Sequence, residues 1–156
     1  MEGSRMNYSD KARGLFKEGY NCSQAVLLAF SDLTGMDEKT ASMLSSSFGG
    51  GMGRLREVCG AVSGMFMVIG ILCGYSDPKD QAAKKAHYER IQQLAEAFRR
   101  ENGSIICREL LGLGKGPDVP VPELRTEAYY KKRPCAELVA DAAAITEEYL
   151  KQHGVI

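Results

Sequence analysis

The sequence predicts an all-α protein, a single-domain bundle of about six helices around a buried, glycine-containing central helix. Apolar residues recur at helical spacing along most of the 156 residues. No segment keeps the alternation of apolar and polar residues that a half-buried strand needs. Cap residues, glycines and prolines separate the helical stretches at short intervals. The length suits one domain with its own core, and no repeat or change in composition divides residues 1–156.

Three helices are predicted in the first third of the chain. The first is short and covers residues 8–19. Asn21 or Ser23 can cap the second helix, and Gly35 ends it. An aspartate caps the third helix, which covers residues 38–47.

A glycine-rich turn precedes the central helix, which is predicted over residues 57–73. Four of the five residues 49–53 are glycine, and they demand unusual backbone angles or the close approach of another group. The sixteen residues 58–73 are almost wholly uncharged, but a membrane-spanning helix needs about 20 apolar residues. We therefore expect this helix to be buried on all sides, with a membrane span as the weaker alternative.

Three more helices are predicted in the second half. A cap residue followed by a proline begins a long helix over residues 78–101. A short helix follows over residues 105–111. Residues 112–134 are rich in glycine and proline, and they predict a long irregular loop of the kind that is often functional. A last helix is predicted over residues 134–152.

The charges of the chain exclude some partners. The 20 acidic and 20 basic residues cancel, so no strong field draws the protein onto nucleic acid or an anionic membrane. The first six residues lack the apolar run of a signal peptide, and we expect a cytoplasmic protein in a reducing compartment. The partners that remain open are a redox partner, a small molecule or a second copy of the chain.

Four of the five cysteines lie at the beginning of a predicted helix: Cys22, Cys59, Cys107 and Cys135. Free backbone amides and the helix dipole favour an anion at such a position. A thiolate is an anion, and it is the form of cysteine that binds a metal or attacks a disulfide. Cys73 lies at the opposite end of its helix, and we interpret it as a core residue. Burial alone is the alternative interpretation for any one of the four.

Five short motifs carry a resemblance to a known family. They occur in the order Asn21-Cys22-Ser23-Gln24-Ala25, Phe48-Gly49-Gly50-Gly51-Met52-Gly53, Cys59-Gly60-Ala61-Val62-Ser63-Gly64, Cys107-Arg108-Glu109-Leu110 and Arg133-Pro134-Cys135. This ordered set, from Tyr20 to about Val139, resembles the C_GCAxxG_C_C family, which is named as redox-active. The family name places glycine before cysteine, whereas the order here is Cys59-Gly60-Ala61. The resemblance implies a redox or metal-binding use of the cysteines.

The preferred hypothesis is a redox-active or metal-binding protein. The four cysteines at helix starts would be its catalytic or metal-ligating residues. They would bind an iron–sulfur cluster or another thiophilic metal, or cycle between dithiol and disulfide. The spacing of the four cysteines in the sequence does not distinguish between these uses. The alternative is a helical ligand-binding or scaffold module with inert buried cysteines and a pocket under residues 112–134. A cysteine hydrolase is disfavoured, because His87 and His153 are poorly placed to serve as its base.

The glycines near these cysteines are candidate cofactor-binding residues: Gly49, Gly50, Gly51, Gly53, Gly60 and Gly64. The backbone amides of the first four could bind an anion beside Arg54 and Arg56, although a turn in a crowded place is the stronger interpretation. Gly60 and Gly64 share one helix face, where tight helix packing is favoured over a ligand. The basic run 131–133 would lower the pKa of a nearby thiol, or would only solubilise the loop.

Overall fold

The structure is a computed structural model that describes residues 7–156. Within that range the chain forms helices joined by turns, and the one strand-like feature is an isolated antiparallel bridge between Val58 and Ile106. The predicted all-α fold class is confirmed. No helix described over residues 7–156 has both the length and the apolar character to cross a membrane.

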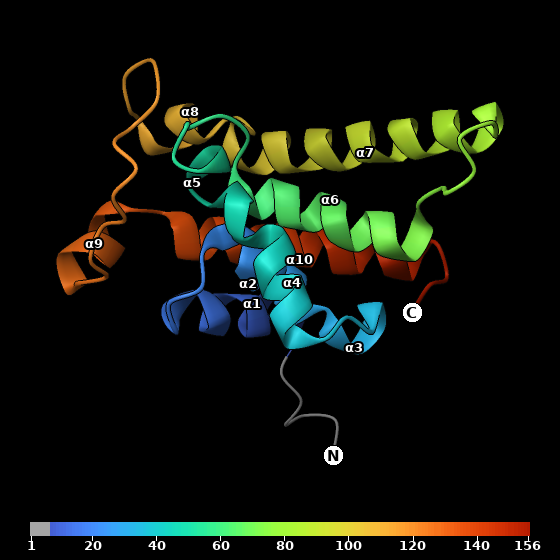
Figure 1. Cartoon of the computed structure of the whole chain (residues 1–156), viewed down its shortest axis with the longest axis horizontal. Coiled ribbons are helices and arrows are strands. Elements are labelled where there is room, and N and C mark those ends of the chain that lie inside the picture. The colour runs from blue at the N-terminus through green and yellow to red at the C-terminus, as the bar shows by residue number, and fades with distance from the viewer. Residues whose placement is uncertain (1–6) are drawn as a thin grey trace.

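Four helices form the centre of the molecule: α1 (Tyr8–Lys17), α2 (Cys22–Ala29), α6 (Gly60–Cys73) and α10 (Cys135–Gln152). Helix α2 packs against both α6 and α10, and α1 packs against α2 and α10 (Figure 1). Burial of apolar side chains between these helices is the main source of stability for such a bundle. Their shared hydrophobic core includes Phe16, Leu27, Met65, Ile69 and Leu150.

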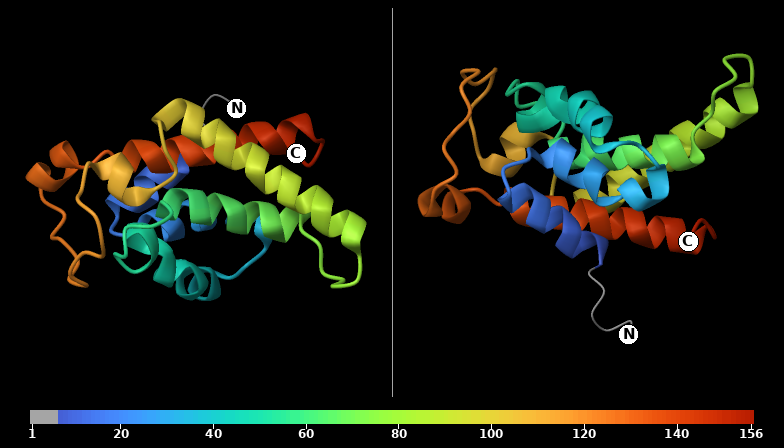
Figure 2. Two further views of the ribbon diagram at one scale, coloured as in Figure 1. Left: turned by 90° about the horizontal axis from the view of Figure 1, so that it is seen from above. Right: turned by 60° about the horizontal axis from the view of Figure 1, so that its bottom comes forward.

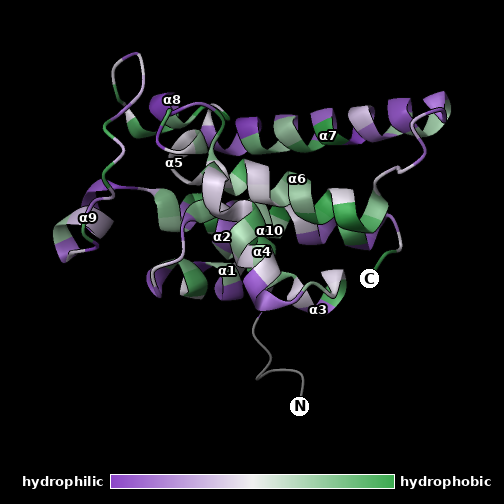
Figure 3. Ribbon diagram, viewed as in Figure 1, coloured by the Kyte–Doolittle hydropathy of each residue, from purple (hydrophilic) through white to green (hydrophobic). Residues whose placement is uncertain are grey.

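Helix α7 (Gln81–Asn102) crosses the outside of α6 and α10 (Figure 2). Leu94 and Phe98 on its inner face are buried, whereas its outer face is hydrophilic (Figure 3). The helix begins three residues later than predicted. The reason is that Asp80 caps it, by accepting a hydrogen bond of 2.9 Å from the backbone N–H of Ala83.

Helix α6 begins three residues after its predicted start, because the preceding segment pairs with a distant part of the chain. The N–H of Cys59 donates to the carbonyl of Ile105 at 2.8 Å, and the N–H of Cys107 donates to the carbonyl of Glu57 at 2.6 Å. The first half of α6 is buried as expected. The prediction of burial on all sides is wrong for the last turn, where Ile71 is 43 % exposed.

Two glycines let α6 lie directly on α2. A Cβ atom on Gly64 would lie 2.8 Å from the carbonyl oxygen of Ser23 and 2.9 Å from the Cβ of Val26. A Cβ atom on Gly60 would lie 3.2 Å from the Cβ of Cys22. The glycines therefore serve tight helix packing, and this packing puts Cys22 beside the start of α6.

Short elements connect α2 to α6: α3 (Ser31–Thr34), α4 (Glu38–Ser45), the 3-10 helix η2 (Ser46–Phe48) and α5 (Gly49–Met52). A capping box of Asn21 and Gln24 fixes the start of α2. The side-chain amides of these two residues donate to the carbonyls of Ser46 and Ser42, at 3.2 and 3.0 Å. The beginning of α2 is thereby held against α4 and η2.

The long connection between α7 and α10 contains two short helices: α8 (Cys107–Leu111) and α9 (Glu127–Lys132). The predicted irregular loop over residues 112–134 is therefore partly helical. Thr126 begins α9 by accepting a hydrogen bond of 3.2 Å from the N–H of Tyr129. The rest of this connection is extended and runs past the starts of α2, α6 and α10 (Figure 1).

Candidate functional site

Four cysteines line one cavity of about 200 Å³. They are the first residues of α2, α8 and α10 and the residue that precedes α6, namely Cys22, Cys107, Cys135 and Cys59. These helix starts gather at one end of the molecule, beside the long connection (Figure 1). Each cysteine is at most 9 % exposed. The fold thus brings four thiols from distant parts of the sequence to one buried space.

Cys22 and Cys135 form a hydrogen-bonded pair in this cavity. The Cys22 thiol donates to the Cys135 sulfur, and this bond is the largest cause that lowers the pKa of Cys135 from 9.0 to about 7. The same bond, followed by burial, raises the pKa of Cys22 well above its usual value. Near neutral pH the pair therefore consists of a substantially ionised Cys135 and a protonated Cys22.

Three arginines add to the stabilisation of the Cys135 thiolate. After the hydrogen bond from Cys22, and against the opposing effect of burial, the charges of Arg133, Arg125 and Arg56 lower the pKa of Cys135. Arg133 is only 8 % exposed, and it lies two residues before Cys135 in the chain. The predicted effect of the basic run 131–133 on a thiol thus comes from its buried member, since the two lysines are exposed.

Cys107 and Cys59 occupy less favourable surroundings. The Arg56 guanidinium donates from Nη1 to the Cys107 sulfur at 3.6 Å, but burial is the larger effect and raises the pKa of that thiol. Burial also raises the pKa of Cys59 to about 12, although the backbone amides of Ala61 and Val62 donate to its sulfur. Both thiols are therefore protonated at neutral pH.

Among the four cavity cysteines the pKa is lowered only at Cys135, and there by side chains and not by the amides of the helix start. At Cys59 the helix amides are present and act in the expected direction, but removal of the sulfur from water outweighs them. Cys135 differs because it combines a hydrogen-bonding thiol with three guanidinium charges. A position at a helix start is therefore not enough to lower the pKa of a cysteine whose sulfur is buried away from water.

Ion pairs fasten the long connection across the cavity. The Asp118 carboxylate accepts hydrogen bonds from Arg54 at 3.1 Å and from Arg56 at 2.9 Å. The Glu123 carboxylate pairs with Arg133. These contacts lower the pKa of both carboxyl groups, chiefly through the hydrogen bonds from Arg56 and Arg133. Arg54, Arg56 and Arg133 thus line the cavity and, through Asp118 and Glu123, also hold the long connection in place.

Arg125 is the functional residue that sequence analysis missed. Its guanidinium donates to the carbonyls of Phe16 at 2.6 Å and Tyr20 at 3.0 Å, and it lies 4.1 Å from the centroid of the Phe16 ring. It also faces Tyr129, whose pKa is raised to about 12 by burial and by the neighbouring Cys135. No local motif marks Arg125, because all of its partners are distant in the sequence or close only after folding.

The candidate glycines divide into two groups. Gly51 has a φ of 70°, and a Cβ atom there would lie 2.6 Å from the Cβ of Cys107. It therefore allows the turn to approach a thiol, and use of the glycines in binding a cofactor stays a prediction. The members that line the cavity are Gly49, Gly50, Gly51 and Gly60, and those that do not are Gly53 and Gly64.

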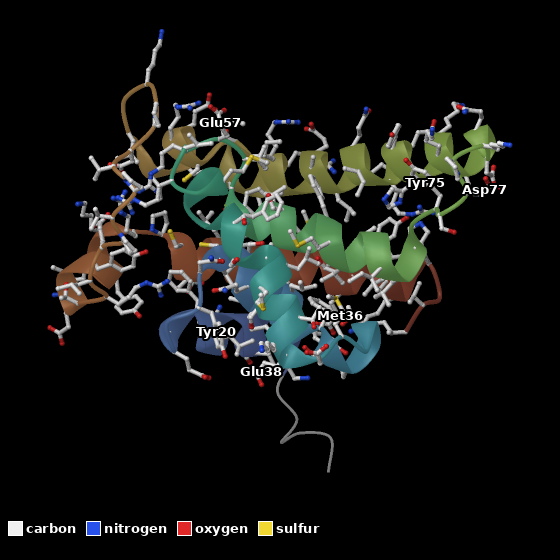
Figure 4. The ribbon with its side chains drawn as sticks, viewed as in Figure 1. Tyr20, Met36, Glu38, Glu57, Tyr75 and Asp77 are labelled. Carbon is white, nitrogen blue, oxygen red and sulfur yellow. The ribbon has the colours of Figure 1, made fainter. Side chains whose placement is uncertain are left out.

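Other reactive side chains lie away from the cavity. Glu57, two residues before Cys59, is at the outer edge of the molecule and pairs with Arg108 at 2.9 Å (Figure 4). Cys73 is half-buried at the end of α6. His87 and His153 are not among the lining residues. The cavity therefore offers a thiolate, thiols, guanidinium groups and one carboxylate, but it has no imidazole base for a hydrolase.

The described side chains do not form a ready-made metal site. Over residues 7–156, no group of three or more histidine, cysteine, aspartate or glutamate side chains is positioned to hold a metal ion. The four cavity cysteines share a space without presenting their sulfurs as a common ligand set, and all are free thiols. A zinc site or an iron–sulfur cluster uses several thiolates at bonding distance, and use of the four cysteines as metal ligands stays a prediction.

Comparison with known proteins gives one match. A family model described as "Putative redox-active protein (C_GCAxxG_C_C)" matches residues 20–149, which include all four cavity cysteines. No curated protein and no solved structure matches the chain.

Proposed function

The chain belongs to the C_GCAxxG_C_C family, and from that premise we propose that it is a thiol–disulfide oxidoreductase whose reacting pair is Cys135 and Cys22. The family resemblance inferred from the motifs is thereby confirmed, and the family is a redox-active one by its description. The observation that carries the finer proposal is the placement of Cys22 and Cys135 at the starts of two packed helices, α2 and α10, on one cavity, where the Cys22 thiol is the largest cause that lowers the pKa of Cys135. A disulfide between them requires the two sulfurs to approach to about 2.05 Å.

The two cysteines have different roles in this reaction. Cys135 is the nucleophile, because its pKa of about 7 provides a thiolate near neutral pH. An attacking thiol is most effective when its pKa is near the ambient pH, since a lower pKa would reduce its nucleophilicity. Cys22 is the resolving thiol, because it is protonated until the negative charge on Cys135 has been consumed.

The reaction consists of two exchange steps. The Cys135 thiolate attacks one sulfur of a substrate disulfide, the substrate S–S bond breaks, and one substrate thiolate leaves. Cys22 then gives up its proton, which passes to that departing thiolate, and attacks the Cys135 sulfur of the mixed disulfide. The second substrate thiolate leaves and takes a proton from solvent. The substrate gains two electrons as two thiols, the protein holds a Cys22–Cys135 disulfide, and an external dithiol reduces it again.

A second candidate function is supported by the burial of the thiols. Every cavity cysteine is at most 9 % exposed, and Phe16, Leu110 and Leu138 add apolar surface to the lining. A helical module that binds a small ligand beside inert cysteines would use the same cavity. The two candidates differ in one respect, which is whether the Cys22–Cys135 pair exchanges with an external disulfide.

A redox titration tests the proposal. The reduced protein is equilibrated with dithiothreitol buffers and, to reach more oxidising potentials, with glutathione buffers of graded oxidised fraction. The samples are quenched with acid, and the remaining thiols are counted by mass spectrometry after alkylation. We expect the loss of two thiols in a single two-electron transition. Cys22→Ser and Cys135→Ser should each abolish the transition, and Cys73→Ser, the matched control outside the cavity, should preserve it. A protein that keeps all five thiols across the titration would be the inert module.

A further inference from the structure

We infer that the substrate of the Cys22–Cys135 pair is a small anionic disulfide, one that carries carboxylate or similar acidic groups, rather than the disulfide of a folded protein. This inference rests on the proposed function and adds the class of substrate. It follows from the size of the cavity, the burial of the sulfurs and the balance of charge on the lining, each of which is independent of the others.

The size of the cavity limits what can reach the thiols. Its volume of about 200 Å³ is below the roughly 300–1,000 Å³ of pockets that hold drug-sized ligands. Cys135 is 8 % exposed and Cys22 is 9 % exposed, so neither sulfur lies on the surface where a folded partner could approach in line. A disulfide must therefore enter the cavity, and only a small or extended molecule can do so.

The charge of the lining selects anions. Four arginines line the cavity, and the two carboxylates that pair with them are Glu123, on the lining, and Asp118, on the covering connection. The four arginines thus exceed the two carboxylates by two positive charges, and a Cys135 thiolate neutralises only one of these; Arg125 alone of the four has no carboxylate partner within residues 7–156. A cleft of one sign with low-dielectric walls concentrates ligands of the opposite sign.

Arg125 provides the uncompensated charge nearest the reacting pair. Its two terminal nitrogens donate to the carbonyls of Phe16 and Tyr20, which are neutral acceptors and cancel no charge. Its positive charge also acts on the Cys135 thiolate, which shows that its field reaches the reacting sulfur. An acidic group of the substrate that lies against Arg125 would therefore hold the disulfide close to Cys135.

Arg54 supplies a second positive charge farther along the cavity. It binds Asp118 at 3.1 Å and donates from Nε to the carbonyl of Val119 at 2.7 Å. Its neighbour Arg56 shares the same carboxylate and also binds Cys107, so one carboxylate serves two guanidinium groups. A molecule with two acidic groups could therefore meet a guanidinium group at Arg125 and another at Arg54.

Three small disulfides of similar length test the inference. They are 3,3′-dithiodipropionate, a dianion; 2-hydroxyethyl disulfide, which is neutral; and cystamine, a dication. Each rate of oxidation of the reduced protein at pH 7 is divided by the rate measured with 2-mercaptoethanol, which removes the intrinsic reactivity of the reagent. We expect the corrected rate for the dianion to exceed that for the neutral reagent by about tenfold or more at low salt, and to fall as salt is added.

Two variants and a control locate the effect. Within each variant, the corrected rate for the dianion is divided by the corrected rate for the neutral reagent. A change in the fraction of Cys135 that is ionised affects both rates equally and therefore cancels in this dianion-to-neutral ratio. Arg125→Gln and Arg54→Gln should each lower that ratio by about threefold or more. Arg108→Gln removes an arginine that pairs with the surface residue Glu57 and does not line the cavity, and it should leave the ratio unchanged.

The outcomes separate this inference from the proposed function. A Cys22–Cys135 disulfide that forms equally fast with all three reagents would overturn the anionic substrate and leave the oxidoreductase intact. Oxidation by the disulfides of insulin at a rate equal to that of the dianion would overturn the small substrate. If none of the reagents oxidises the pair, the proposed function itself is wrong.

Discussion

Arg56 donates to the Cys107 sulfur at 3.6 Å and, through two other nitrogens, to Asp118, so one guanidinium joins a cavity thiol to the connection that covers it. Arg56 is only 5 % exposed, and its φ of 63° is unusual for a residue with a side chain. Such a backbone conformation persists only where surrounding contacts hold it. Here the side chain is held by Asp118 and Cys107, and the backbone by hydrogen bonds to the Gly50 carbonyl and from the Arg108 N–H, each of 3.2 Å.

The first prediction concerns the reactivity of Cys107. Arg56 lowers the pKa of this thiol against the larger effect of burial. Replacement of Arg56 by glutamine should therefore raise the Cys107 pKa further and slow its alkylation at pH 8 by about tenfold. The rate is followed by mass spectrometry of the modified peptides. Cys73, which is outside the cavity, should react at the same rate in both proteins, and an unchanged rate at Cys107 would contradict the assigned contact.

The second prediction concerns the pKa of Cys135. Cys22→Ala removes the thiol that donates to Cys135, so the midpoint of its alkylation rate against pH should rise from about 7 toward the ordinary 9.0. Cys22→Ser keeps a hydroxyl donor of similar size. Its midpoint should therefore lie between those of the original protein and the alanine variant. Identical midpoints in all three proteins would show that the arginines alone set the pKa.

The third prediction concerns stability at alkaline pH. Cys59 has a pKa of about 12 in the folded protein, against 9.0 as the ordinary value. Below pH 9 the thiol is protonated in both states and contributes no pH dependence. Above pH 9 the unfolded chain loses the proton that the folded protein keeps, so the free energy of unfolding falls as the pH rises toward 12. From pH 8 to pH 10.5 this loss should be about 2 kcal/mol.

Urea denaturation of the reduced protein at these two pH values measures that loss. The Cys59→Ala variant should show a pH-dependent loss smaller by the same amount, because the residue that titrates only on unfolding is absent. The other buried thiols and Tyr129 titrate in both proteins and cancel in the comparison. Equal losses in the two proteins would mean that Cys59 is not buried as the structure has it.

The fourth prediction concerns the contact between α2 and α6. In Gly64→Ala the new methyl group would lie 2.8 Å from the Ser23 carbonyl oxygen, which is backbone and cannot move aside cheaply. We expect a loss of about 1–3 kcal/mol in the free energy of unfolding. Gly70→Ala is the matched control on the same helix, where no described atom lies within 4 Å of the added carbon. It should be neutral or stabilising by up to about 1 kcal/mol. Equal effects in the two variants would argue against the close helix contact.

The main helices and their order could be predicted because cap residues, glycines and prolines near their ends mark them in the sequence. Asn21, one of the two predicted caps, caps α2, and the α10 helix begins beside its proline. The start of α6 could not be predicted, since it depends on backbone pairing between Glu57 and Cys107, fifty residues apart. Helix α9 was missed for a different reason. Its cap, Thr126, is a usable local signal, but the surrounding glycines and prolines favoured a loop.

The cysteines of the site could be predicted from sequence, but their individual pKa values could not. Position at a helix start is a local property, and all four residues have it. The pKa depends instead on which groups meet in three dimensions. Cys135 receives its hydrogen bond from Cys22 and the charge of Arg125 from a segment with no motif. Sequence alone therefore identifies the set of thiols but not the nucleophile among them.

Disulfide mapping measures whether Cys135 and Cys22 exchange with a substrate disulfide as a pair. The reduced protein is treated with one equivalent of 3,3′-dithiodipropionate, blocked with excess N-ethylmaleimide at pH 6.5, digested and analysed by mass spectrometry before and after dithiothreitol. We expect one cross-linked species, the peptide of Cys22 joined to that of Cys135, which dithiothreitol returns to two free peptides. A dominant disulfide between any other two cysteines, or a stable mixed disulfide on Cys135 that Cys22 never resolves, would contradict this pairing.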